Sequence, residues 1–382
     1  MKACINIDVE VFVVDNNSTD GSKEFFTNKF PSVKFIWNKE NIGFAKANNA
    51  ALQYCSGQYI LFLNPDTILS EDCLEKTIAF LKAQQNPGAC GIRMIDGSGN
   101  FLPESKRAFP SPLTSLFKLT GLTYLFPRSK TFARYYLGNL DEHKNYEVDV
   151  LAGAFMLIPK KVLDITGSFD EAFFMYGEDI DLGYRIQKAG FKNYYFAESS
   201  IIHFKGESTK KGNIKYTRMF YKAMSIFVKK HYSSGSAGLF NALMQTAIWF
   251  RATLSGIENI FKNIFYSTKK IKQHKLIIAS GEEEYNSLVT LLQKATVEMK
   301  VVGRINSQSL KNTANAAILI EMIKQKNADE ILFCEGEISF KEIISAIQHL
   351  RLPVSYKFYS AGSHSIIGSD SKDNSGDCIS FN

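Results

Sequence analysis

Short runs of β-branched and aromatic residues alternate with segments of helical period along the first hundred residues. This pattern is typical of parallel strands joined by crossover helices and predicts an α/β fold. The helices are expected near residues 22–29, 43–55 and 71–84. The expected strands are 10–15, 33–37, 59–63 and 90–95.

The pattern changes at residue 97 and becomes an aromatic stretch up to residue 146, which contains proline. Its rings have two interpretations: packing beneath a long connection, or a platform for an acceptor substrate. Regular strand pattern returns at 148–158, and a helix is expected near 214–231.

Three domains are predicted: 1–232, a linker at 233–273, and 274–382. The linker begins with a Ser/Gly-rich hinge and continues as an amphipathic helix containing Trp249. This helix either packs on the protein's own domains or lies on an anionic membrane. Charge favours a local acidic partner surface, since residues 204–272 carry thirteen basic and two acidic residues in a chain of net charge +7.

The segment beyond His274 restarts the α/β pattern with KLIIAS, EMKVVGRI, DEILFCE and VSYKFYS as strands. It predicts a second, smaller Rossmann-like unit with an unstructured tail after Gly368. One glycine, Gly281, stands where a dinucleotide fingerprint needs three, and the glutamates that follow it would repel a pyrophosphate. A regulatory or docking module is therefore expected instead of an NAD-dependent oxidoreductase.

Six cysteines have no CxxC pair and no regular spacing, so no zinc site or disulfide framework is indicated. Acidic residues near the start do not fit a signal peptide, and no uncharged apolar run reaches 18 residues. We expect a cytoplasmic protein, attached peripherally to the inner face of a membrane if the linker helix binds lipid.

Polar residues follow three of the predicted strands, at positions where ligands of open α/β sheets bind. Asp15 lies in VVDNNSTDGS, the loop NIGFAKANN spans 41–49, and Asp66 lies in FLNPDT. Each alone also suits a turn or a helix cap. Together they make Asp66 a candidate ligand for a hard divalent cation, and the 41–49 loop a candidate for phosphate or ribose oxygens.

Carboxylates gather again in FFMYGEDID, where Glu178, Asp179 and Asp181 open a predicted helix. Helix capping explains carboxylates in a first turn, but not their crowding beside aromatic residues. His203, in HFKGES, is by itself more typical of a structural histidine than of a ligand.

The motifs VVDNNSTDGS, NIGFAKANN, LNPDT, LAGAFMLIPK, FDEAFFMYGEDIDLGYR and HFKGES, in this order, resemble the family 2 glycosyltransferases of the GT-A fold, in particular the rhamnosyltransferase-like branch. The resemblance covers residues 8–232. It implies an α/β GT-A-type transferase sheet and an enzyme of the hexosyltransferase class.

Site roles follow from the same resemblance. Asp179 corresponds to the catalytic base, and Asp66 and His203 correspond to residues that meet Mg²⁺ or Mn²⁺, with Asn64 in place of the first Asp of the DxD element. The residues expected to line the donor pocket are Asp15, Asn17, Asn41, Gly43, Asn48, Asn64, Gly153 with Ala154, and Glu178.

The expected reaction is inverting transfer of a sugar, with rhamnose as a candidate, from a nucleotide-diphosphate donor to a polysaccharide or lipid-linked glycan; no nucleic-acid partner is indicated. Glu178, Asp181 and the neighbouring aromatic rings are expected to raise the pKa of Asp179. The alternative is a catalytically inactive scaffold, because family members place a strand and helix before the strand of Asp15. Without that first strand the sheet would keep an open apolar edge, and either a misassigned start or a natural fragment would explain it.

Overall fold

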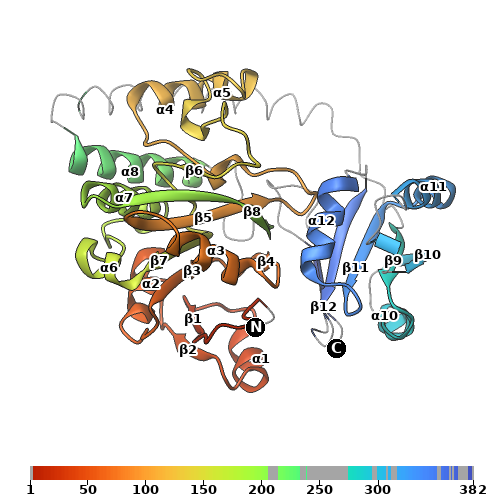
Figure 1. Ribbon diagram of the computed structural model, residues 1–382. Coiled ribbons are helices and arrows are strands. Elements are labelled where there is room, and N and C mark those ends of the chain that lie inside the picture. Colours follow the sequence, from red (N-terminus) through yellow and green to blue (C-terminus); the bar gives the residue numbers. More distant parts are fainter. Residues whose placement is uncertain are drawn as a thin grey trace.

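The computed structural model describes residues 3–204, 214–232, 238, 274–294, 299–306, 309–310, 316–350, 354–360, 363, 365–368 and 377–380. It shows two α/β units side by side, a larger one before residue 233 and a smaller one from residue 274 (Figure 1). The predicted linker helix at 233–273 falls almost entirely outside the described residues. No described helix is long and apolar enough to cross a membrane.

The larger unit contains most of the elements that the sequence predicts. Its strands are β1 (Phe12–Asp15), β2 (Lys34–Trp37), β3 (Tyr59–Leu63), β4 (Thr67–Leu69), β5 (Pro87–Ile95), β6 (Tyr146–Glu147), β7 (Phe155–Pro159) and β8 (Lys192–His203). Its α-helices are α1 (Ser22–Lys29), α2 (Phe44–Leu52), α3 (Cys73–Lys82), α4 (Pro112–Leu119), α5 (Leu122–Leu125), α6 (Lys160–Thr166), α7 (Glu178–Lys188) and α8 (Ile214–His231).

The main sheet of this unit has the order β3-β7-β5-β8-β4, with β6 also paired to β8. It is buried on both faces: one cluster includes Phe62, Met156 and Leu182, and another includes Phe155 and Ile201. Alternation along β3 and β7 sends neighbouring side chains to opposite faces, so each strand contributes to both clusters. Apolar burial of this extent is the main force that fixes the strand ends in space.

Two expectations about the sheet need correction. The strands are not all parallel, because β7 lies between β3 and β5 and pairs antiparallel to both. They also do not form a single sheet. Strands β1 and β2 are parallel but form a separate two-stranded sheet, and among the described strands β1 pairs only with β2. Strand β3 is at one end of the main sheet, and among the described strands it pairs only with β7. Glu10 links the two parts instead, since its carboxylate accepts hydrogen bonds from Ser56 and Gly57.

The predicted aromatic stretch forms α4, α5 and a compact loop structure. Tyr135 and Tyr136 are buried, which fits the packing interpretation. Tyr124, Leu125 and Phe126 on and after α5 are instead 61%, 70% and 46% exposed. The platform interpretation therefore stays open for the α5 end of the stretch.

The smaller unit confirms the four strands predicted for it and adds two more. The sheet order is β10-β9-β11-β12-β13-β14, with the first four parallel and the last two antiparallel. The tail is not wholly unstructured, because 377–380 pairs with β13. The elements of the smaller unit are β9 (His274–Ser280), α10 (Glu282–Lys294), β10 (Met299–Asn306), α11 (Ala316–Lys326), β11 (Glu330–Glu335), α12 (Phe340–Leu350), β12 (Ser355–Ser360), β13 (Ser365–Gly368) and β14 (Asp377–Ser380).

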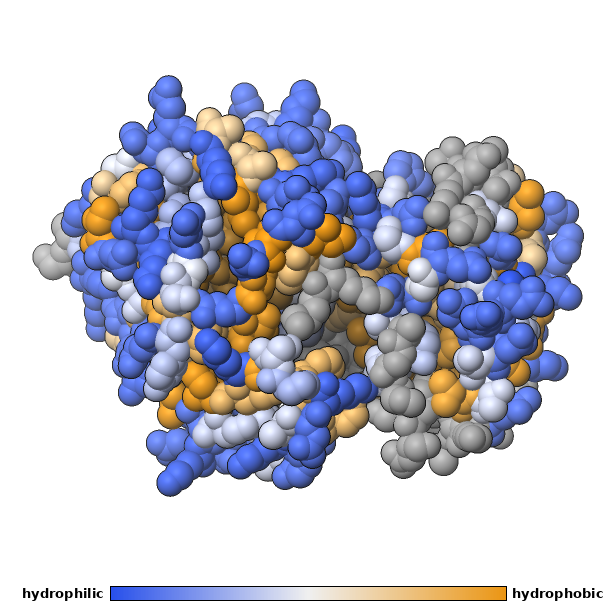
Figure 2. Space-filling view, turned by 60° about the horizontal axis from the view of Figure 1, so that its bottom comes forward, coloured by the Kyte–Doolittle hydropathy of each residue, from blue (hydrophilic) through white to orange (hydrophobic). Residues whose placement is uncertain are grey.

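The surface of the larger unit is hollowed on the face that comes forward in Figure 2, and hydrophobic side chains line part of that hollow. Exposed apolar side chains of this unit include Val13 of β1, Leu63 at the end of β3, and Phe174. Large exposed apolar side chains near polar strand ends are a common feature of ligand sites.

Candidate active site

Asn64, Asp66 and His203 come together where β3 ends and β4 pairs with β8. The pairing places Thr67 opposite His203, and the backbone N–H of Phe204 donates to the carbonyl of Asp66 over 2.9 Å. His203 Nε2 lies 3.2 Å from Asp66 Oδ1 and 3.5 Å from Asn64 Nδ2. The three predicted residues therefore form one cluster. They come from distant parts of the chain, since Thr67, which follows Asp66, is 136 positions before its partner His203.

His203 in this cluster is almost fully buried. Its side chain is 8% exposed, and Asp66 is 14% exposed. The other ring nitrogen, Nδ1, is buried and has no hydrogen-bond partner among the described residues. Nε2 is the ring nitrogen that faces the Asp66 carboxylate, so it is the one placed to share a bound group with Asp66.

Asp179 lies in the first turn of α7 and contacts the glycine loop before β7. Its Oδ2 accepts hydrogen bonds from the backbone N–H of Gly153 at 3.3 Å and from Arg107 at 2.5 Å. The loop also contacts the cluster of Asn64, Asp66 and His203, because the N–H of Asn64 donates to the carbonyl of Ala154 over 3.0 Å. A short chain of contacts thus joins Asp179 to Asn64.

Arg107 is a site residue that the motifs did not reveal. It is 8% exposed and also donates to the carbonyl of Leu151 over 2.6 Å. Although burial alone would lower its pKa, the charge of Asp179 raises the pKa of this guanidinium. The only sequence signal for Arg107 was the SKR run at 105–107. This run lies in the 97–146 stretch, which was interpreted from its aromatic residues alone.

Glu178, next to Asp179 in the first turn of α7, has a raised pKa. Burial, and after it the negative charge of Asp179, raises the pKa of Glu178 to about 8. Asp181 does not contribute its charge as expected, because it is fully buried in ion pairs with Arg185, Lys230 and His231. Burial would raise the pKa of Asp181, but the hydrogen bonds from Lys230 and His231 and the charge of Arg185 lower it.

The 41–49 loop packs against the segment that leads to Asp179. Gly43 has φ +86°, and a Cβ there would lie 2.6 Å from the carbonyl oxygen of Phe174, so only glycine fits. Asn41 accepts a hydrogen bond from the N–H of Gly43, which is the turn role. Asn48 donates to the carbonyl of Phe44 within its own helix.

Asp15 reaches the same edge through its neighbour. Asn16 donates to the carbonyl of Gly43 over 3.3 Å, and Asn38 donates to Asn16. One oxygen of Asp15 accepts from the N–H of Ser18, as the turn interpretation predicts. Asn17 has φ +66°, which asparagine tolerates better than most residues. The loop of Asp15 is therefore adjacent to the Gly43 loop, although it lies in a separate sheet.

No group of three or more His, Cys, Asp or Glu side chains suited to a metal occurs within the described part of the chain. Asp66 and His203 supply two donors of the kinds that Mg²⁺ and Mn²⁺ accept. The remaining coordination positions would have to come from a diphosphate and water, as is usual for Mg²⁺.

Comparison with known proteins places these residues in context. Residues 1–165 match the family model described as Glycosyl transferase family 2. This matched part includes Asp15, Asp66 and Gly153 but ends before Asp179 and His203.

Two curated relatives and one solved structure are similar to the chain. N-acetylglucosaminyl-diphospho-decaprenol L-rhamnosyltransferase of Mycobacterium tuberculosis is 27% identical over 236 residues, which cover 59% of this chain and 76% of the relative. Rhamnosyltransferase WbbL of Escherichia coli K12 is 29% identical over 171 residues, which cover 42% and 61%. A mannosyltransferase from Pyrobaculum calidifontis, solved with GDP-Man and Mn²⁺, matches with a TM-score of 0.40 and 16% identity over 68% of this chain and 67% of that one.

Proposed function

We propose that this chain, which is similar to the family 2 glycosyltransferases and to their rhamnosyltransferase-like branch, transfers a sugar from a nucleoside-diphosphate donor with inversion at the anomeric carbon. The sugar we propose is rhamnose, and the acceptor a lipid-linked or polysaccharide glycan. The names of the two rhamnosyltransferase relatives support the sugar, and the name of the mycobacterial one supports the acceptor class.

The observation that carries the proposal is the short chain of contacts between two clusters. The Asp66–His203 pair joins the Asp179–Arg107 pair through Asn64 and the 153–154 loop. Transfer from a nucleotide sugar needs a site for the diphosphate beside a base for the acceptor hydroxyl. This one set of contacts joins the residues that we propose for the two roles.

Asp66 and His203 would hold Mg²⁺ or Mn²⁺ together with the donor's diphosphate. Nε2 of His203 and the carboxylate of Asp66, which lie 3.2 Å apart, fit such an ion in donor type. Neutralisation of the charge that develops on the leaving diphosphate is the chemistry a bound ion supplies.

Asp179 acts as the base. Its carboxylate is held in place by Arg107, whereas burial and the charge of Asp179 raise the pKa of Glu178 to about 8, which makes Glu178 the poorer base at pH 7. The acceptor oxygen forms a bond to the anomeric carbon, the bond from that carbon to the diphosphate oxygen breaks, and the acceptor's proton passes to Asp179. A carboxylate has lone pairs left for this proton after it accepts from Arg107 and Gly153.

The acceptor side of the proposal draws on the exposed end of the aromatic stretch. Tyr124, Leu125 and Phe126 present apolar surface to solvent, and an isoprenoid chain has matching chemistry. We propose this surface as the contact for the lipid part of the acceptor.

Calorimetry with the purified full chain tests the proposal. UDP, GDP and dTDP are titrated separately, with MnCl₂ and with EDTA. We expect one of them to bind only with Mn²⁺, and Asp66→Asn to lose that binding because a ligand charge is removed. Asp179→Asn should bind the same nucleotide as the wild type does, while transfer from the matching nucleotide sugar is abolished.

Two results would overturn the proposal. Absence of Mn²⁺-dependent binding for all three nucleotides would remove the diphosphate site. Full transfer by Asp179→Asn would remove Asp179 as the base.

A further inference from the structure

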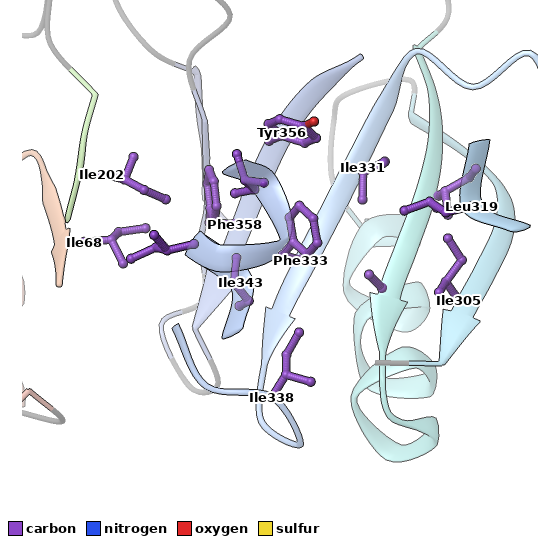
Figure 3. Packing of buried hydrophobic residues seen from close by; sticks show 14 of the residues in the cluster. Ile68, Ile202, Ile305, Leu319, Ile331, Phe333, Ile338, Ile343, Tyr356 and Phe358 are labelled. Carbon is purple, nitrogen blue, oxygen red and sulfur yellow. The ribbon is translucent and has the colours of Figure 1, made fainter. Parts of the chain in front are cut away.

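The two units share one hydrophobic core cluster. Ile68 of β4, together with Ile202 and Phe204 of the larger unit, belongs to the same buried cluster as Ile343 of α12 and Phe358 of β12. Figure 3 shows Ile68 and Ile202 directed toward Phe358 and the helix that carries Ile343. The rings of Phe204 and Phe358 pack edge to face with centroids 5.5 Å apart.

A polar contact borders this apolar cluster. Both carboxylate oxygens of Glu71 accept hydrogen bonds at the start of α12, from the backbone N–H of Phe340 at 2.7 Å and of Lys341 at 2.9 Å. The free N–H groups and the partial positive charge of a helix N-terminus favour a carboxylate there. Lys341 also lies 2.8 Å from Asp72. The larger unit therefore caps a helix of the smaller one.

These contacts lie on the strands that carry the proposed metal site. Strand β4 is a three-residue edge strand, and Asp66 precedes it while Glu71 follows it. On β8, His203 stands next to Phe204, whose ring lies in the shared cluster. A short edge strand has few contacts to hold its position, so the contacts of Ile68 and Glu71 with the smaller unit add to the pairing with β8 in fixing β4.

We propose that the smaller unit is a positioning element for the Asp66–His203 pair, with Glu71 and Phe358 as positioning residues. This inference rests on the proposed function, because it assigns a role relative to the metal and diphosphate site. The smaller unit then acts on the transferase site by holding β4 against β8, without contributing a group that touches substrate.

The test compares variants that remove similar side chains but differ in place. Phe358→Ala removes the ring that contacts Phe204, and Leu288→Ala removes a fully buried side chain from the cluster on the other side of the smaller unit's sheet. Glu71→Ala removes the two hydrogen bonds that the larger unit accepts from the start of α12, and Glu75→Ala removes an exposed carboxylate in the first turn of α3. Phe358→Leu keeps most of the apolar contact.

The measured quantity is the dissociation constant of Mn²⁺, read from the electron paramagnetic resonance signal of the free ion in the presence of the nucleoside diphosphate that the wild type binds. We expect about tenfold weaker Mn²⁺ binding for Phe358→Ala and Glu71→Ala, the effect typical of residues that orient metal ligands. Leu288→Ala and Glu75→Ala should bind as the wild type does, and Phe358→Leu should recover most of the affinity. Thermal unfolding of each variant confirms that the protein is folded at the assay temperature.

The outcomes separate this inference from the proposed function. If the wild type binds no Mn²⁺ with any nucleoside diphosphate, the proposed function fails. If the wild type binds and Asp66→Asn does not, but Phe358→Ala and Glu71→Ala keep full affinity, the positioning role is wrong. Equal loss in Phe358→Ala and Leu288→Ala would likewise contradict it, since general destabilisation would then explain the effect. If Phe358→Ala does not fold, the pair Glu71→Ala and Glu75→Ala decides.

Discussion

Arg107 and Glu178 are two neighbours of Asp179 that differ in charge. Arg107 pairs with Asp179 from a buried position, and Glu178, 6% exposed, is held in its neutral form by burial and by the nearby negative charge. Adjacent acids in different environments can take different roles in this way.

The protonation of Glu178 makes stability depend on pH. Its pKa is raised from 4.5 to about 8 in the folded protein, so between these values the folded state binds more protons than the unfolded state. The free energy of unfolding should then fall with rising pH, by up to about 1.4 kcal/mol per pH unit from this group. Glu178→Gln should remove this slope and gain stability relative to the wild type as pH rises toward 8. Urea unfolding over this range checks it, and parallel pH profiles would contradict it.

Arg107→Lys tests the positioning of the base. Lysine keeps the positive charge but loses the planar group that contacts both Asp179 and Leu151. We expect transfer to fall by about a hundredfold, the scale of a small misplacement, with unchanged Mn²⁺-dependent nucleotide binding. The control is Arg93→Lys, at another buried arginine whose partner is Glu142, and it should transfer sugar normally. Equal activity of the two variants would show that Arg107 does not orient the base.

At the scale of elements, the sequence predicted where strands and helices lie better than which strands pair. Strand β3 was predicted to its exact bounds because a continuous apolar run is bounded by polar residues. The antiparallel insertion of β7 was not predicted, because partner choice depends on contacts between positions about a hundred residues apart. The motifs indicated Asp66, Asp179 and His203. They did not indicate Arg107, because its position depends on a pairing with Val150, which is distant in the sequence.

Helices α7 and α8 are joined by a buried charge network. Asp181 on α7 is fully buried and contacts Lys230 at 2.8 Å and His231 at 2.6 Å on α8. Asp181→Asn leaves Arg185 and Lys230 without their shared anion and should cost about 3–5 kcal/mol in the free energy of unfolding. Asp170→Asn removes only a partly exposed partner of Lys230 and should cost less than about 1 kcal/mol. Denaturant unfolding compares the two, and similar losses would show that the network adds little.

At the scale of the whole molecule, the shared core makes the two units one cooperative structure. The cluster containing Ile68, Phe204, Ile343 and Phe358 has members from both units, and the Glu71 cap adds a polar link. Unfolding one unit would expose the apolar side chains that the other contributes, at a cost proportional to the area exposed.

Cooperative unfolding follows from this shared core. Scanning calorimetry of the full chain should show one transition, with a calorimetric enthalpy equal to the van't Hoff enthalpy. Phe204→Ala should lower the temperature of that transition as a whole. Two well-separated transitions in the wild type would show that the units are independent.

The central claim is that Asp66 and His203 mark the metal and diphosphate position of a glycosyltransferase site. Anomalous diffraction from crystals of the full chain grown with MnCl₂ and the nucleoside diphosphate tests it most directly. The account predicts a manganese peak in contact with the Asp66 carboxylate and the His203 ring, with the diphosphate beside it. A manganese and diphosphate position away from both residues would contradict the account.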